Sequence, residues 1–518
     1  MPTIDVEVIF NEAKLGFWNY KLVVCILSIY LLNSYYIVFI PFVYGDLNYR
    51  CIYYDTLDNS THSQCYTNSS GVFEKCQKFL YEPTQDFEDT AVSKFDLVCD
   101  RHGLKQWDMT SFLISQIFAV AVSGLLIDYW GRMNIIRCTI FCSILISITY
   151  FFLPNFFLMC LARGVGCFLN LSKDIALIIL LPEILPKRFG NSVTSVQLCL
   201  FGVGTAMNSI FSMVFSNWRK YILFRIVIVE VLMLLMSLFL LEESPKWLLQ
   251  KKRYEEFRLS IHKLFRQNRT VMPENLNQIL NNIHQETLTE KSSYVYKLFR
   301  TKRTALRMIS LSLSWISSLI LFYALAFFKE LFNFNVHAYY ILIGLSEIPG
   351  TYLQILLVGY FGFRWTNIIS QVLSAICLFI NCFLRSNDYW MLLMYVNAIS
   401  TKIFSTVAMN NIFAWNSQVA PTNLRGIGMG LCAIFGRMSS LSLPPLFVYF
   451  SNLYYLLPGI VLGIIALIAG MFSIFIPETY NVIPPDNIEE YEALGTKTYT
   501  VIKKQRTDVL MNINETDT

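Results

Sequence analysis

Several ionisable side chains lie within long apolar stretches of the chain, among them Lys173, Glu347, Lys402 and Arg437. A charge near the middle of a bilayer is costly unless it is paired or faces water, so each of these residues is a candidate functional residue. A guanidinium can hold a carboxylate through two hydrogen bonds, and we favour substrate contact over structural pairing for Arg437. Lys402 and Glu347 are expected at similar depth, where they either pair with each other or contact a substrate.

A second group of charged residues stands where apolar stretches end. The sequence LLIDYWGRM at Leu125–Met133 has a counterpart, LLVGYFGFR, at Leu356–Arg364, with Gly359 in place of Asp128. Such echoes at nearly one offset indicate a six-helix unit that occurs twice in the chain. The charges expected to gate the two units through inter-helix salt bridges, rather than to bind substrate, are Asp128, Arg132, Glu183, Arg188 and Glu243. Of these five residues, Arg188 fits the alternative of a solvated loop charge best.

The composition places these residues in a membrane protein. Hydrophobic residues make up 55% of the 518-residue chain and charged residues only 15%, which is too apolar for soluble domains. The apolar runs have the length, about 20 residues, that crosses a hydrocarbon core. We therefore expect an all-α membrane protein with twelve transmembrane helices in two six-helix, pseudo-symmetric bundles. The expected spans are residues 22–44, 107–129, 135–153, 156–181, 192–215, 220–241, 306–328, 338–358, 365–385, 389–413, 427–450 and 454–476.

The distribution of Lys and Arg orients these spans. Basic residues concentrate in alternate loops, which are therefore expected on the cytoplasmic side together with both termini. The loop 45–106 is then extracellular. It holds Cys51, Cys65, Cys76 and Cys99, expected to form two disulfides in one of three pairings, and sequons for glycans at Asn59 and Asn68. The expected domains are a cytoplasmic N-terminus (1–21), an N-terminal bundle (22–241) that includes loop 45–106, a cytoplasmic central loop (242–305), a C-terminal bundle (306–476) and a cytoplasmic tail (477–518).

Several function classes are disfavoured. A net charge of +5, spread between apolar runs, argues against a nucleic-acid-binding surface. No Cys/His cluster in the sequence has metal-ligand spacing, so no metal site is expected. The sequence also lacks a Walker A glycine loop, which argues against ATP-driven transport by this chain. We expect neither an enzyme nor a cofactor.

The loop motif carries a family resemblance. Gly124, Asp128, Gly131 and Arg132 stand at the spacing of the loop motif between the second and third helices of the major facilitator superfamily. Within that superfamily the chain resembles the organic cation, anion and zwitterion transporters of solute carrier family twenty-two, from the first helix to about Glu490. The stretches that carry this resemblance, besides the cysteine-bearing first loop, are KFDLVCD (Lys94–Asp100), ESPKWLL (Glu243–Leu249), YKLFRTKRTALR (Tyr296–Arg307) and PETYNVIPPDNIEE (Pro477–Glu490).

The resemblance implies roles for individual residues. Arg437 falls where the anion and zwitterion transporters of the family carry arginine and its cation transporters carry aspartate, which implies a carboxylate on the substrate. Lys402 and Glu347 match positions that are standard across the family. Gln197 and Tyr323 match polar positions that resemble cavity-lining residues, although an interhelical hydrogen bond suits them equally. Members of the family often have a lysine about two positions away from Lys173. The resemblance therefore implies a substrate-binding role for Lys173 less directly than for the other residues.

Our first hypothesis is a secondary transporter with the major facilitator fold, in the plasma membrane. By alternating access through a central polar cavity, it would move small organic anions or carnitine-like zwitterions, with membrane lipid as its surroundings. A first rival is an organic cation carrier, which the acidic Glu347 and Asp174 permit. A second rival is a sensor or scaffold that kept the fold but lost transport, suggested by Gly359 and by Gln418 where acids are usual. The sequence leaves the oligomeric state open.

Overall fold

The structure is a computed structural model, and the chain divides into two compact units. One unit is built from Val6–Pro273 and Phe334–Gly344, the other mainly from Glu274–Asn333 and Leu345–Thr518. We refer to them as the N-terminal and C-terminal units. The residues that the structure describes are 9–10, 13–34, 38, 40–53, 56–57, 65–69, 72–76, 78–270, 299, 301–327, 335–384, 391–421, 424–454, 456–482, 485, 488–496 and 499.

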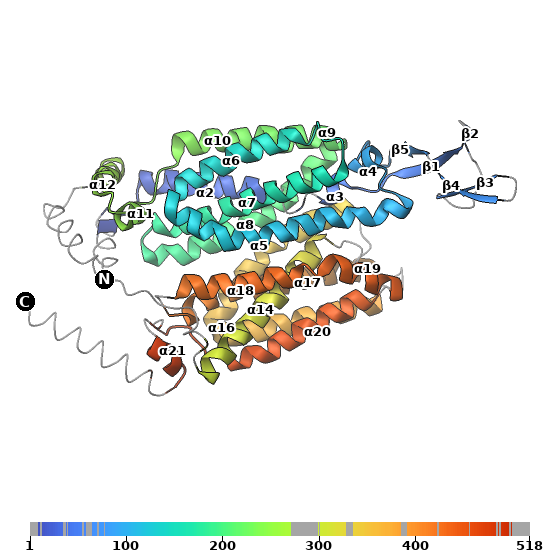
Figure 1. Cartoon of the computed structure of the whole chain (residues 1–518). Helices are drawn as coiled ribbons and strands as arrows, with labels where there is room; N and C mark the ends of the chain where they lie inside the picture. The colour runs from blue at the N-terminus through green and yellow to red at the C-terminus, as the bar shows by residue number, and fades with distance from the viewer. Residues whose placement is uncertain are drawn as a thin grey trace, which may run out of the picture. The chain divides into compact units, whose positions relative to one another are not determined.

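The N-terminal unit is a bundle of long apolar helices (Figure 1). Its helix α7 packs against both α5 and α6, and α2 packs against α8 and α10. The long helices are α2 (Phe17–Asn33), α5 (Lys105–Trp130), α6 (Arg132–Thr149), α7 (Phe156–Glu183), α8 (Lys187–Val214) and α10 (Val229–Leu240). The shorter ones are α3 (Ile40–Val43), α4 (Ala91–Phe95), η2 (Cys99–Leu104), α9 (Trp218–Tyr221), the π-helical η3 (Ile222–Ile228), α11 (Pro245–Gln250), α12 (Tyr254–Asn268) and most of α15 (Val336–Leu345).

The C-terminal unit is a second bundle, in which α16 packs against α17 and α20, and α14 packs against α18. A seam of small polar side chains joins its helices: Asn367 donates to Ser473 at 2.8 Å, and Gln371 donates to Ser318 at 3.1 Å. Such interhelical hydrogen bonds hold helices together where lipid removes the hydrophobic driving force. The helices are α14 (Lys302–Phe327), α16 (Glu347–Leu384), α17 (Met391–Val419), α18 (Arg425–Ser440), α19 (Leu443–Leu453), α20 (Leu457–Phe472), η7 (Ser473–Phe475) and α21 (Ile488–Ala493).

The helices account for the predicted spans. Ten helices in the described part of the chain are long and apolar enough to cross a membrane, and Phe17–Asn33 is a shorter apolar helix. One of the ten, Val336–Leu384, contains 49 residues and corresponds to two predicted spans, because α16 is interrupted at Gly362. The architecture thus agrees with the prediction of twelve helices in the major facilitator fold.

Two boundaries differ from the prediction. The first helix begins at Phe17 rather than at residue 22, where Asn19 accepts a hydrogen bond from the backbone N–H of Gly16, and Lys21 inside it pairs with Glu242 at 2.6 Å. Near the end of the chain, the predicted span 427–450 is divided between α18 and α19. A proline occupies the first turn of α19, where its missing N–H is tolerated.

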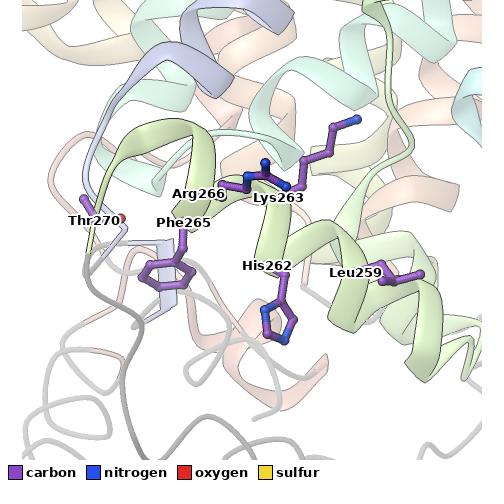
Figure 2. Close-up of a pocket in the computed structure, with 6 residues that line it drawn as sticks. All are labelled: Leu259, His262, Lys263, Phe265, Arg266 and Thr270. Atoms are coloured by element: carbon purple, nitrogen blue, oxygen red, sulfur yellow. The ribbon is translucent and has the colours of Figure 1, made fainter.

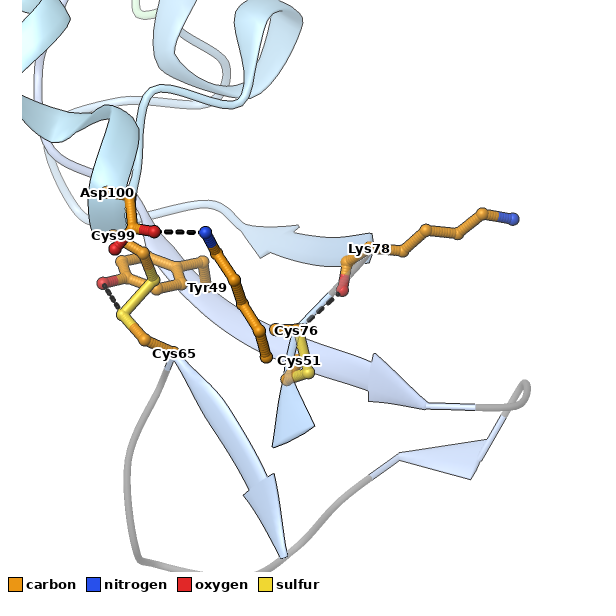
Figure 3. The surroundings of a disulfide bond; sticks show 8 residues. Tyr49, Cys51, Cys65, Cys76, Lys78, Cys99 and Asp100 are labelled. Carbon is orange, nitrogen blue, oxygen red and sulfur yellow. Dashed lines mark hydrogen bonds and ion pairs between the residues drawn. A yellow bond between two sulfur atoms is a disulfide. The ribbon is translucent and has the colours of Figure 1, made fainter. Parts of the chain in front are cut away.

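The loop predicted to be extracellular contains short strands, which the helix-based prediction missed. Strands β1 (Asn48–Tyr53), β2 (Thr56–Leu57) and β5 (Lys78–Glu82) form an antiparallel sheet in the order β2-β1-β5, and β3 (Tyr66–Ser69) pairs with β4 (Val72–Lys75). Two disulfides cross-link this region, Cys51–Cys76 and Cys65–Cys99, with Cα atoms 5.8 and 5.7 Å apart (Figure 3). The second disulfide ties the β3–β4 hairpin to η2, directly before α5. Asn59 lies outside the described residues, and only the backbone of Asn68 is described.

The disulfide pairing is the first testable prediction. Peptide mapping by mass spectrometry of the non-reduced, full-length protein should recover Cys51 linked to Cys76 and Cys65 linked to Cys99. Since both links staple strands that form little apolar core, reduction should loosen this region and expose it to limited proteolysis before the helices unfold. Recovery of a Cys51–Cys65 link, or of four free thiols, would contradict the structure here.

Candidate functional site

The predicted gating charges converge on one turn of the N-terminal unit. Helix α5 ends and α6 begins at Gly131, whose φ of +94° is favourable only for glycine. The carboxylate of Glu243 lies against this turn and accepts hydrogen bonds from the backbone N–H groups of Arg132 and Met133, both at 3.1 Å. A Cβ atom at residue 131 would lie 2.4 Å from that carboxylate. The turn therefore presents the amino end of α6 to an anionic side chain, as helix dipoles favour.

Arg132 extends the network to the end of α7. Its guanidinium makes a bidentate contact with Glu183, with Nε–Oε2 and Nη2–Oε1 distances of 3.1 and 3.0 Å. Asp128 lies 3.4 Å from the same guanidinium, but its side chain is 63% exposed. The structure thus brings together four of the five predicted gating residues. The side chain of the fifth, Arg188, lies outside the described residues.

The C-terminal unit has a carboxylate equivalent to that of Glu243, but the described residues there form no equivalent of the ion pairs of Arg132. Glu478 accepts hydrogen bonds from the backbone N–H groups of Phe363 and Arg364, each at 2.9 Å, next to Gly362 with its φ of +77°. Gly359 and Gln418 stand where the first unit has Asp128 and Glu183. Arg364 stacks over Trp365 instead, and it has no carboxylate partner among the residues the structure describes.

The neighbouring carboxyls of Glu242 and Glu243 have pKa values shifted in opposite directions by their surroundings. Burial raises the pKa of Glu243 above its usual value, although hydrogen bonds from the backbone of Ser244, Met133 and Arg132 oppose this shift. Burial acts in the same direction on Glu242, but hydrogen bonds from Lys21, Lys263 and Trp18 outweigh it and lower the pKa of that carboxyl. Glu243 is therefore the carboxyl whose charge depends most on keeping its backbone donors.

Two of the predicted intramembrane charges form an ion pair. Lys402 on α17 lies 2.6 Å from Glu347 on α16, and their side chains are 3% and 7% exposed. The ammonium also lies 4.3 Å from the ring centroid of Phe322. Both charges are thereby neutralised within the C-terminal unit. The sequence had left pairing and substrate contact open for them, and the structure shows the pairing.

Arg437 on α18 is arranged differently. Its side chain is buried, and its Nη1 donates to the carbonyl of Ala433, one turn earlier, at 3.4 Å. Among the described residues no carboxylate pairs with this guanidinium, and its Nε has no hydrogen-bond partner. Tyr323 on α14 is also buried and lies in the neighbourhood of this guanidinium. The structure thus brings together two of the residues predicted to contact substrate.

Two further candidates lie in the N-terminal unit. Gln197 on α8 is fully buried, and neither atom of its amide has a hydrogen-bond partner among the described residues. Lys173 on α7 is also fully buried, and its ammonium donates to no described acceptor. Glu230 and Asp174 attract it electrostatically, while Asp174 accepts a hydrogen bond from Asn33 at 2.6 Å. These side chains retain unused hydrogen-bonding capacity in the protein interior.

One ion pair was missed by the sequence analysis. Arg163 on α7 lies 3.1 Å from Asp108 on α5, and the two side chains are 1% and 0% exposed. The ring of Phe112 lies beneath the guanidinium, 5.6 Å away. Both residues fall inside predicted spans, at 107–129 and 156–181. Because an unpaired charge in hydrocarbon is costly, their positions alone could have indicated that each needs a partner. They link α5 and α7 near the end of the unit that carries the strands.

Comparison with known proteins agrees with this architecture. The profile of the family described as "Sugar (and other) transporter" matches residues 64–486. The chain therefore belongs to this family of membrane transporters, within the major facilitator superfamily, and it is not an enzyme. The inward-open structure of the xylose transporter XylE from E. coli superposes with a TM-score of 0.65 at 15% identity, covering 92% of this chain and 99% of XylE.

Curated relatives support the narrower resemblance to solute carrier family 22. Solute carrier family 22 member 4 of Mus musculus is 23% identical over 93% of this chain and 94% of its own length. The organic cation transporter protein of Drosophila melanogaster is 22% identical, over 87% of this chain and 82% of its own. The human organic cation/carnitine transporter 2 is 23% identical, over 79% of this chain and 73% of its own length. The chain is thus an integral membrane transporter related to carriers of organic ions.

The second prediction concerns the Gly131 turn. Glu243→Gln replaces an acceptor of two backbone N–H groups by an amide that can accept through only one atom. Hydrogen bonds to charged groups contribute about 1.5–3 kcal/mol, so transport should slow by about tenfold or more with little change in substrate affinity. Asp128→Asn is the matched control, because it removes an exposed contact worth about 1 kcal/mol or less.

Initial rates and half-saturation concentrations of tracer uptake, normalised to surface expression, make the comparison. Asp128→Asn should also lower the rate rather than the affinity, but by a smaller factor than Glu243→Gln. A weaker effect of Glu243→Gln than of Asp128→Asn would show that the turn is not the main gating contact.

Proposed function

We propose that this protein is a secondary transporter of small organic anions or carnitine-like zwitterions, working by alternating access. The observation that carries this proposal is the buried Arg437 guanidinium, which has no carboxylate partner among the described residues. Two other buried cations do have one, since Lys402 pairs with Glu347 and Arg163 with Asp108, whereas the buried ammonium of Lys173 has no ion-pair partner among the described residues. A buried guanidinium persists at lowest cost when a carboxylate reaches it, and a substrate can supply that carboxylate.

The electrostatics favour an acid over an amine as substrate. A carboxylate beside Arg437 gains charge-assisted hydrogen bonds in a medium of low dielectric constant, whereas an organic cation would lose hydration against a like charge. Tyr323, buried in the neighbourhood of Arg437, is proposed as the second hydrogen-bonding group for the same substrate. The names of two relatives, organic cation transporter protein and organic cation/carnitine transporter 2, support an organic ion as cargo, and carnitine is a zwitterion with a carboxylate.

We assign the remaining candidates according to their surroundings. Gln197 and Lys173, with their unused hydrogen-bonding capacity, are proposed to contact substrate from the N-terminal unit. Lys402 and Glu347 are proposed to border the site as a neutral pair, which orients substrate without setting its charge. The plasma membrane is the proposed location, with both termini cytoplasmic and glycans at Asn59 and Asn68.

The two rival functions remain as outcomes of experiment. A cation carrier needs an unneutralised acid, but Glu347 is paired with Lys402, and Asp174 is held by Asn33 and attracted by Lys173. A scaffold without transport is suggested by the C-terminal unit, where Arg364 lacks a carboxylate partner among the described residues. Uptake equal to that of an inactive control, for anionic, zwitterionic and cationic tracers alike, would favour the scaffold.

Substitution of Arg437 tests the proposed substrate class. Arg437→Lys keeps the charge but loses the two-pronged geometry, so carboxylate uptake should fall by about tenfold, the effect of one lost hydrogen bond to a charged group. Arg437→Asp should abolish carboxylate uptake and can admit cations. The measurement is uptake of matched anionic, zwitterionic and cationic tracers by correctly localised wild type and variants.

Lys78→Gln, which removes an exposed charge from β5, is the control for an unspecific effect of net charge. Carboxylate uptake that is unchanged in Arg437→Asp would make Arg437 a structural residue and overturn the assignment.

A further inference from the structure

Helix α12 has two opposed faces. Phe257, Ile261, Leu264 and Phe265 are buried on one side. On the other lie Leu259, His262, Lys263 and Arg266, which line an open cavity of about 480 Å³ together with Phe265 and Thr270 (Figure 2). Their spacing of three and four residues places them on a single stripe of the helix. We call these four residues the α12 stripe.

Contacts fix the helix at the ends of two membrane-spanning helices. Lys263 lies 2.9 Å from the carboxylate of Glu242, two residues beyond the end of α10. Asn268, the last residue of α12, accepts a hydrogen bond from the backbone N–H of Trp18, in the first turn of α2, at 3.0 Å. In Figure 1, α12 lies at the end of the N-terminal unit opposite to the strands. The stripe therefore lies beside the start of α2 and the end of α10, two apolar helices.

The charges in the second half of α12 are of one sign, although Glu242 pairs with Lys263 and Glu255 lies one turn before Leu259. From Arg258 to Arg269 the sequence contains four Arg or Lys residues and one histidine but no acid. Arg258, Arg266 and Arg269 have exposed side chains without a carboxylate partner among the described residues. By contrast, Arg253 at the start of the helix is paired with Glu256 at 2.7 Å. The second half of α12 thus carries positive charge that the described protein does not neutralise.

Exposed apolar groups accompany these charges. Leu259, within the stripe, is 68% exposed, and Phe17 and Tyr20 at the start of α2 are 67% and 60% exposed. Aromatic and leucine side chains next to basic groups are typical of the interfacial layer of a membrane, where rings and alkyl chains meet lipid and cations meet headgroups. A phosphate ion from solution would offer no partner for these apolar side chains.

We propose that the α12 stripe, with Arg258 and Arg269, binds the phosphorylated headgroup of an anionic phospholipid, of the polyphosphoinositide class, in the adjoining leaflet. Basic clusters directly beside a membrane-spanning helix attract such headgroups, and each charge near the surface contributes about 1 kcal/mol, or about fivefold in affinity. The lipid would bridge α12 to the ends of α2 and α10, where Glu242 already pairs with both Lys263 of α12 and Lys21 of α2. The inference does not depend on the proposed substrate.

The experiment measures binding of a fluorescent short-chain phosphoinositide to purified full-length protein, with phosphatidylcholine of the same chain length as the neutral reference. The Arg258→Gln/Arg266→Gln variant should bind about 25-fold more weakly, because it loses two headgroup charges. The matched control, Lys78→Gln/Arg101→Gln, removes two exposed charges near the strands and should bind as the wild type does.

A second variant separates a lipid site from a phosphate site. Leu259→Glu leaves every arginine in place but opposes insertion of the helix beside the acyl chains. It should weaken phosphoinositide binding more than binding of water-soluble inositol hexakisphosphate. Equal binding by wild type and Arg258→Gln/Arg266→Gln would overturn the proposal. Equal loss of both ligands in Leu259→Glu, or displacement of the lipid by millimolar inorganic phosphate, would reduce the stripe to an unspecific anion site.

Discussion

A charge inside hydrocarbon must be neutralised or hydrated, and the packing of both units depends on this constraint. The pair Asp108–Arg163 joins α5 to α7, and the pair Glu347–Lys402 joins α16 to α17. Removing one partner of a buried pair leaves an uncompensated charge, which costs more than the pair itself contributes. Each pair therefore fixes the rotation of two helices about their axes, and the rest of each bundle packs around that choice. Arg437 and Lys173 are both buried without an ion-pair partner among the described residues, and of the two Arg437 carries the planar guanidinium that suits a carboxylate.

The two units share a backbone device but not its electrostatics. Glu243 and Glu478 each accept hydrogen bonds from the start of a helix that follows a glycine of positive φ. The internal sequence repeat thus corresponds to the same turn in both units. Only the N-terminal unit adds the bidentate Arg132–Glu183 pair to this turn. Separating the ends of α6 and α7, which this pair joins, therefore costs more energy than separating the corresponding helix ends of the C-terminal unit. An alternating-access cycle built on them would be controlled mainly by the N-terminal turn.

The sequence predicted the number of spans and the repeat, because bilayer thickness sets helix length and hydropathy reports it directly. It also placed Lys402 and Glu347 at one depth, and the structure pairs them. It could not choose among three disulfide pairings or find the strands, since these depend on contacts between distant segments. The partner of Arg163 was equally hidden, because helix rotation decides which side chains meet. That Arg437 lacks a described carboxylate partner is likewise a property of packing, invisible in the residue order.

The central claim is that the substrate carries a carboxylate. The most direct test is uptake by the wild-type protein, at fixed membrane potential, of three tracers with one carbon skeleton that ends in a carboxylate, a primary amide or an amine. Because the amide loses a charge-assisted contact of about 1.5–3 kcal/mol, the account predicts saturable carboxylate uptake at least about tenfold above the amide, and no mediated amine uptake. Preferential uptake of the amine, or equal uptake of all three, would contradict it.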